Sequence, residues 1–128
     1  MRLLLDTHMI LAILRGDVGE RFPDVPELLV DQETVGFASI ASLWEIAIKT
    51  RLGKLDPGMP LDEIARSLDE MGLSLLGIEV GHVITAAEPE PSTRDPFDRL
   101  LLSQCQIENL KLLTVDRALA DHPHAFKF

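Results

Sequence analysis

The stretch LLLDTHMIL, residues 3–11, has the form of a short buried strand that leads into a helix. Its three consecutive leucines are typical of a strand covered on both faces, and Asp6 ends the apolar run. From Thr7 onward, apolar residues recur at three- and four-residue spacing, which predicts a helix that ends near Gly16. A strand followed by a helix is the repeating unit of α/β folds, so the question is whether the unit repeats.

The alternation of strands and helices does continue along the chain. Apolar runs predict further strands at residues 35–38, 73–78 and 111–115. Helical spacing and capping signals predict helices over residues 25–30, from Ser39 or Ser42 to Gly53, over 60–71, over 83–87 and from Asp95 to Asn109. The expected buried side of the helix over 60–71 consists of Leu61, Ile64, Ala65 and Leu68. This order implies an α/β layer structure around a largely parallel sheet.

The composition fits one folded domain over residues 1–128, with 46% hydrophobic and 26% charged residues. The 12 basic and 21 acidic residues give a net charge of −9, which argues against a nonspecific nucleic-acid coat. The single cysteine, Cys105, excludes a disulfide framework. No apolar run approaches the roughly 18 residues of a membrane helix, and Asp6 and His8 interrupt the N-terminal run too early for a signal peptide. We therefore expect a cytoplasmic protein that does not enter a membrane.

Five acidic residues occupy positions where α/β proteins bind ligands. Asp6 and Asp116 follow predicted strands, and Asp95 and Asp98 lie in the first turn of a predicted helix. Glu45 lies inside an apolar helix. Ligands of open α/β sheets bind outside the carboxyl ends of the strands, and Mg²⁺ prefers oxygen ligands. The positions therefore predict a divalent-cation site at one edge of the sheet.

Each of these acids also has a purely structural interpretation. Asp6, Asp95 and Asp116 are good helix caps, the last for a short helix over 117–120. Asp98 suits a helix N-terminus, and Glu45 is placed to pair with Lys49 one turn later. These interpretations stay open, although together they leave the shared strand-edge placement unexplained. A basic cluster follows Glu45 and would hold a phosphate backbone if the acids form a cleft: Lys49, Arg51 and Lys54.

Three stretches resemble the PIN domain of VapC-type toxins, in order and in spacing. They are LLLDTHMIL at residues 3–11, SIASLWEIAIKTRLGKL at 39–55 and RDPFDRLLLSQCQIENLKLLTVD at 94–116. The resemblance implies a three-layer α/β/α fold with a central, mostly parallel sheet. It implies a Mg²⁺- or Mn²⁺-dependent endoribonuclease, the toxin of a type II toxin–antitoxin pair, in which a metal-activated water hydrolyses RNA phosphodiester bonds. The chain departs from the family at Leu11-Ala12-Ile13, where aromatic residues are frequent, and at Ser92-Thr93, where His is frequent.

The resemblance also implies site residues and partners. The family's catalytic residues carry over onto Asp6, Glu45, Asp98 and Asp116, which with Asp95 are also the expected metal ligands. Whether Asp95 or Asp98 ligates, and whether one or two ions bind, is left open. The expected partners are an RNA substrate, a VapB-type antitoxin and a second copy of the chain in a homodimer. The alternatives are a noncatalytic PIN-like RNA- or protein-binding module and, less favoured, a phosphoaspartate receiver or phosphatase-like domain.

Overall fold

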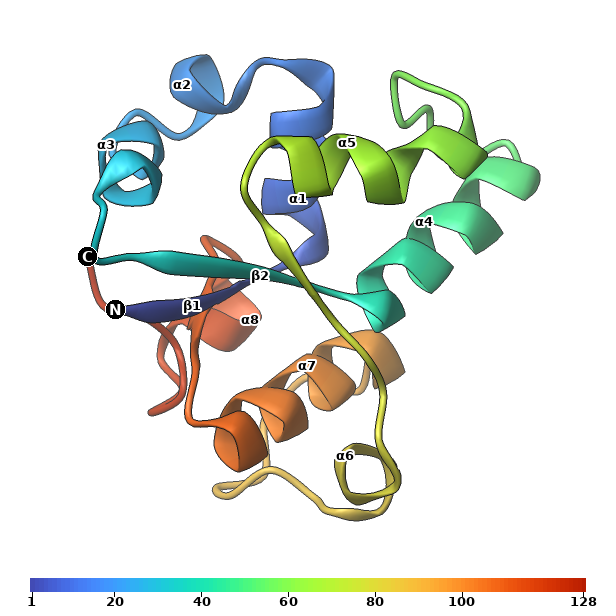
Figure 1. The fold of residues 1–128 in the computed structure, drawn as a ribbon. Coiled ribbons are helices and arrows are strands. Elements are labelled where there is room, and N and C mark those ends of the chain that lie inside the picture. Colours follow the sequence, from blue (N-terminus) through green and yellow to red (C-terminus); the bar gives the residue numbers. More distant parts are fainter.

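A computed structural model describes all residues, 1–128, and contains one sheet of four parallel strands in the order β3-β2-β1-β4 (Figure 1). The first strand of the chain therefore lies inside the sheet. Leu5 at its end is in register with Ala38 on one side and Leu113 on the other, so that the strand ends meet at one edge. The strands are β1 Arg2–Leu5, β2 Val35–Ser39, β3 Ser74–Leu76 and β4 Lys111–Leu113.

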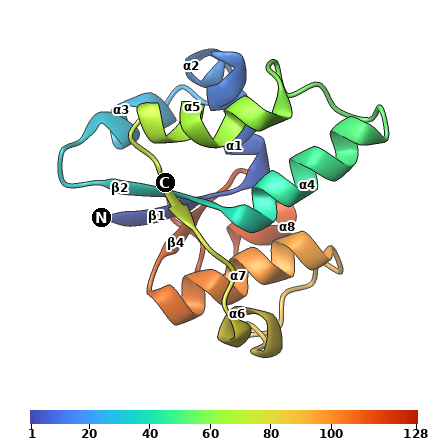
Figure 2. The ribbon, with the colours of Figure 1, turned by 45° about the vertical axis from the view of Figure 1, so that its right-hand side comes forward.

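Helices cover both faces of this sheet. In two views, α1, α2, α3 and α5 lie on one side, while α6, α7 and α8 lie on the other (Figures 1 and 2). The helices are α1 Thr7–Arg15, α2 Val18–Arg21, α3 Val25–Val30, α4 Ile40–Arg51, α5 Ile64–Glu70, α6 Val80–Ile84, α7 Pro96–Glu108 and α8 Arg117–Ala120, with a 3₁₀ turn at Leu61–Glu63. The expected three-layer α/β/α arrangement around a parallel sheet is confirmed.

The leucine run of β1 joins two hydrophobic cores. Leu3 and Leu5 point into the core on the α1 side, and Leu4 points into the core on the α7 side. All three are fully buried, which contributes about 1.5–3 kcal/mol for each side chain. This alternation, with both faces apolar, explains why the strand has no polar residue before Asp6.

Most of the predicted boundaries near the candidate site are confirmed. Asp6 caps α1, which ends at Gly16 in a left-handed conformation with φ +76°. Ser39, rather than Ser42, caps α4 through a bond from the Ala41 amide to its Oγ. The long helix α7 runs from Pro96, the first residue after Asp95, to Glu108.

Other boundaries were wrong. The helix predicted over 60–71 begins with the 3₁₀ turn, becomes α-helical only from Ile64, and leaves Ala65 exposed. The strands predicted over 73–78 and 111–115 are shorter, at Ser74–Leu76 and Lys111–Leu113. Beyond the end of β4, Val115 is exposed and offers little burial to extend that strand. The short helix α2 was not predicted, and none of its residues is buried.

The helix predicted over 83–87 lies at Val80–Ile84 instead. Its start is set by a capping box, in which the Glu79 amide donates to Nδ1 of His82 at 2.9 Å. Nε2 of His82 therefore carries the ring proton and donates to Glu108 of α7 at 2.8 Å. The contact between α6 and α7 thus decides where this helix begins.

None of the helices combines the length and the apolar character that spanning a membrane requires.

Candidate functional site

A pocket of about 320 Å³ lies at the carboxyl edge of the sheet, and all five predicted acids line it. Four basic side chains share the same pocket. The charged residues lining it are Asp6, Glu45, Asp95, Asp98 and Asp116, with Arg15, Arg21, Lys49 and Lys54. The parallel register brings the acids together, because β1, β2 and β4 all end at this edge.

Asp6 forms the buried floor of the pocket. It is 3% exposed, and its Oδ1 accepts the Met9 amide at 2.9 Å as the cap of α1. Burial raises the pKa of this carboxyl, and nearby Asp116 adds to the rise. Hydrogen bonds from Thr114 and Met9 and the charge of His8 act in the opposite direction. Burial outweighs these favourable contacts, so the anionic form of Asp6 is disfavoured in the pocket.

Asp95 and Asp98 project from the first turn of α7. Asp95 Oδ1 accepts the amides of Phe97 and Asp98 at 2.8 and 3.1 Å. Burial, then the charge of Asp95, and then more distant acids raise the pKa of Asp98 to about 6, although a bond from Thr93 Oγ1 at 3.3 Å lowers it. Asp98 is thus destabilised as an anion by the same residues that form the pocket.

Glu45 is held by two partners, one for each oxygen. Thr7 Oγ1 donates to Oε1 at 2.7 Å, and Lys49 Nζ donates to Oε2 at 2.6 Å. Ser42 Oγ lies 3.0 Å from Thr7 Oγ1, and because Thr7 has a single hydroxyl proton, Ser42 is the donor in that pair. Glu45 is only 7% exposed, so the paired charges explain how a carboxylate is tolerated among apolar neighbours. Its bond to Glu45 is also the main reason that the pKa of Lys49 is raised.

Asp116 lies three residues beyond the end of β4, not directly at its end as the strand prediction implied. Its amide donates to Thr114 Oγ1 at 3.0 Å, and its Oδ1 accepts the Ala118 amide at 2.9 Å as the cap of α8. Asp116 is close enough to Asp6 for its charge to raise the pKa of that carboxyl.

The structural roles proposed for these acids are therefore all present. Asp6, Asp95 and Asp116 are caps, Asp98 lies in a first helical turn, and Glu45 pairs with Lys49. A cap bond occupies one carboxylate oxygen, here Oδ1 in each case. These roles therefore orient the acids without using up their capacity to accept a cation.

The donor chemistry of the pocket fits a hard divalent cation. Five carboxylates supply only oxygen ligands, and two of them, Asp6 and Asp98, have a raised pKa mainly because burial disfavours their negative charge. No three of the acidic, histidine or cysteine side chains already converge on one point. A cation held by three of them would therefore require side-chain rotation within the pocket.

A family model for the PIN domain matches residues 3–125, which is nearly the whole chain. The chain belongs to the PIN-domain family. Among solved structures, it is similar to a chain in the crystal structure of VapBC2 from Rickettsia felis bound to a DNA fragment from their promoter. The identity is 15% and the TM-score 0.64, over 98% of this chain and 96% of that chain. No curated protein matches it. PIN domains are generally nucleases and generally use divalent metals.

Several residues that shape this PIN-domain site were not predicted. Thr7 and Thr93 orient Glu45 and Asp98, and each is close in sequence to a predicted acid. Arg15 and Arg21 come from the ends of two separate helices, so no local pattern marks them. Arg51, which was predicted to join the basic cluster, does not line the pocket.

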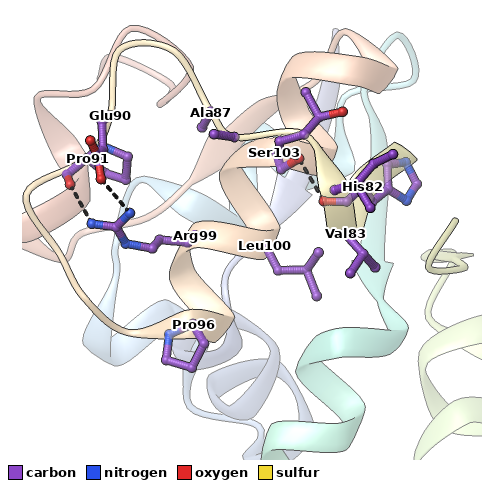
Figure 3. Close-up of a pocket in the computed structure, with 12 residues that line it drawn as sticks. His82, Val83, Ala87, Glu90, Pro91, Pro96, Arg99, Leu100 and Ser103 are labelled. Atoms are coloured by element: carbon purple, nitrogen blue, oxygen red, sulfur yellow. Dashed lines mark hydrogen bonds and ion pairs between the residues drawn. The ribbon is translucent and has the colours of Figure 1, made fainter. Parts of the chain in front are cut away.

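A larger cavity of the PIN domain, about 390 Å³, lies between α6, α7 and the loop before α7 (Figure 3). The charged side chains that line this cavity, Arg99 and Glu90, are already paired. Arg99 donates to Glu90 at 3.0 Å and to the Pro91 carbonyl at 3.2 Å. Arg99 Nε also donates to the Thr93 carbonyl at 2.7 Å. Arg99 therefore fixes the loop that carries Thr93 and leads into α7, and the cavity has no acid cluster of its own.

Proposed function

We propose that this PIN domain, spanning residues 1–128, is a VapC-type toxin: a Mg²⁺- or Mn²⁺-dependent endoribonuclease of a type II toxin–antitoxin system. The observation that carries the proposal is the pocket in which five carboxylates meet at the carboxyl edge of the sheet. Hydrolysis of a phosphodiester needs charge stabilisation on phosphate oxygens and an activated water, and carboxylate-held cations are a common means to both.

In this proposal Asp6, Asp98 and Asp116 hold the cation, with Asp95 as a further ligand. A bound Mg²⁺ or Mn²⁺ supplies Lewis acidity toward a phosphate oxygen and lowers the pKa of water. The protein contributes position, because each of the three main ligands is fixed by hydrogen bonds at the start of a helix. Water attack would leave a 5′-phosphate and a 3′-hydroxyl.

The fourth catalytic residue, Glu45, has the role of ligating the cation or orienting the attacking water. Its carboxylate cannot rotate freely, because Thr7 and Lys49 hold its two oxygens. Lys49 stays protonated at neutral pH, since its pKa is raised above the usual lysine value. The Ser42–Thr7–Glu45 chain is therefore a positioning device for this carboxylate.

The proposed partners are an RNA substrate, a VapB-type antitoxin and a second copy of this chain, all in the cytoplasm. The similar structure contains VapBC2, and an uncontrolled ribonuclease would damage its own cell. An antitoxin with a basic side chain directed into the acid pocket would compete with the cation for the same carboxylates. Excess Mg²⁺ or Mn²⁺ should then weaken inhibition.

Inducible expression in bacteria tests the proposed function. Wild type should arrest growth and degrade RNA, while Asp6→Asn should do neither and still accumulate as folded protein. The matched control is Asp69→Asn, which makes the same change at an exposed position on α5. Equal toxicity of wild type and Asp6→Asn would contradict the proposal, as would growth arrest without RNA cleavage.

A further inference from the structure

The acid pocket has a basic wall on one side. Arg15 at the end of α1, Arg21 at the end of α2 and Lys54 in the loop after α4 all line it. The helices α1 and α2 lie on one face of the sheet, whereas α7 and α8, which follow Asp95 and Asp116, lie on the other (Figures 1 and 2). The pocket is therefore electrostatically divided, with cations on the α1 side and most acids on the α7 side.

These three cations have no acidic partner. The ion pairs of the structure involve Lys49, Arg66, His82 and Arg99, and none involves the basic wall. In a protein with a net charge of −9, acidic partners are abundant. Unpaired cations beside unpaired carboxylates suit a ligand with two separate groups. One group would lie at the acids, and a second, anionic group would lie at the basic wall. A phosphodiester chain has this pattern, because each nucleotide adds one negative charge.

Arg15 is the member of the wall whose side chain is held by hydrogen bonds within the protein. Its Nε and Nη2 donate to the Asp56 carbonyl at 3.0 and 2.6 Å. The loop around this carbonyl is shaped to receive it: Asp56 Oδ1 accepts the Gly58 amide at 2.9 Å, and Gly58 has φ +82°. A Cβ on Gly58 would lie 3.4 Å from Arg15 Cγ, so the loop packs directly on the arginine. The guanidinium is thus held in place, and its remaining N–H donors are available for a ligand.

We propose that Arg15, with Lys54 and Arg21 beside it, binds a phosphate adjacent to the scissile one and thereby fixes the direction in which a single RNA strand crosses the pocket. This inference rests on the proposed ribonuclease function and adds a substrate subsite to it. A fixed guanidinium recognises a phosphate by two parallel hydrogen bonds, which a lysine cannot reproduce. Arg15 is accordingly a binding residue for the neighbouring nucleotide, and it takes no part in the chemical step.

Steady-state cleavage of a short RNA by the metal-loaded protein tests this assignment. Arg15→Ala should raise KM by about tenfold, equivalent to about 1.4 kcal/mol, and leave kcat within about twofold. Arg15→Lys should give an intermediate KM. Arg51→Ala is the matched control, because it removes the same charge three positions before Lys54 from a residue outside the pocket. It should behave as wild type.

The position of the contact can be mapped with substrates that carry one neutral methylphosphonate. At one position beside the scissile bond, wild type should lose the same factor of about ten, whereas Arg15→Ala should lose nothing further. If Arg15→Ala does not fold, Lys54→Ala in the exposed loop provides the same comparison, with a smaller rise in KM of about threefold. The assignment would be overturned by equal KM values for wild type and the variants or by a loss in kcat alone. Additive losses at every methylphosphonate position would also overturn it.

Binding without metal separates this inference from the proposed function. Fluorescence anisotropy with labelled single-stranded RNA should show weaker binding by Arg15→Ala, and a slope of log K against log salt that is smaller by about 0.7. If wild type cleaves no RNA, the proposed function fails and this binding experiment still decides the subsite. Identical affinity and salt dependence for Arg15→Ala and wild type would refute it.

Discussion

Replacing Asp98 by Asn should stabilise the metal-free protein at neutral pH. The pKa of Asp98 is raised from 3.8 to about 6, mainly by burial and then by Asp95. The folded state therefore binds a proton more tightly than the unfolded state does. The corresponding stability is fully present below the unfolded pKa and is lost as pH rises through about 6. At neutral pH the wild-type protein carries this penalty, and the Asn variant does not.

The expected size follows from the shift. A difference of about two pKa units corresponds to an upper limit of about 3 kcal/mol. Asp98 is only partly buried, so solvent screening reduces this value, and an anion in the first turn of α7 is also favoured by the helix dipole. The net gain for Asp98→Asn should be about 1 kcal/mol at neutral pH.

Urea denaturation in EDTA at neutral pH and near pH 4 measures this gain. The two proteins should differ at neutral pH, and the difference should shrink near pH 4, where Asp98 is protonated in the folded state and partly protonated in the unfolded state. Asp69→Asn, at an exposed site on α5, should show neither effect. Millimolar Mg²⁺ should stabilise wild type more than the variant, because only wild type keeps the full ligand set. A variant that is less stable than wild type at neutral pH, or a gain that is independent of pH, would refute the reasoning.

Four further predictions concern the acid pocket, the oligomeric state and the core. Thr7→Val should lower cleavage by about tenfold and destabilise the fold by about 1.5 kcal/mol, because Glu45 loses a hydrogen-bond donor. The control Thr50→Val should leave stability unchanged or raise it, because Thr50 Oγ1 is buried without a partner. The affinity for Mn²⁺, measured by calorimetry, should rise as pH increases through about 6, because Asp98 must lose its proton to bind; an affinity constant across this range would contradict the assignment. Light scattering should show a dimer at micromolar concentration, and a monomer would count against the proposed homodimer. Cys105 should resist thiol reagents in the folded protein, because burial raises its pKa to about 12; rapid labelling would show that α7 opens.

The parts of the fold that could be predicted are those that local sequence determines. The leucines of β1 are buried on both faces, and Asp6 and Asp95 provide caps that need no distant partner. The start of α6 could not be predicted in this way, because it depends on a contact between His82 and Glu108, which are 26 residues apart. The ends of β3 and β4 likewise depend on how far neighbouring layers cover them.

The residues of the candidate site also fall into those that local sequence determines and those that depend on distant contacts. Four of the acids could be chosen from the sequence because they follow a strand or begin a helix, and Glu45 because it interrupts an apolar stretch of α4. The parallel register then brings them to one pocket. Arg15 and Arg21 could not be chosen, since they reach the pocket only through the packing of α1 and α2 and a loop built around Asp56 and Gly58. Arg51 was chosen wrongly for the same reason, because proximity in sequence to Lys54 does not place it on the same surface.

Cleavage of an end-labelled RNA by purified protein tests most directly whether the acid pocket is a metal-dependent ribonuclease site. Wild type should cut the RNA with Mg²⁺ or Mn²⁺, stop in EDTA and leave 5′-phosphate ends, and Asp116→Asn should be inactive under all conditions while showing the same circular dichroism spectrum. Cleavage that persists in EDTA, cleavage by Asp116→Asn at the wild-type rate, or no cleavage by wild type with either metal would contradict the account.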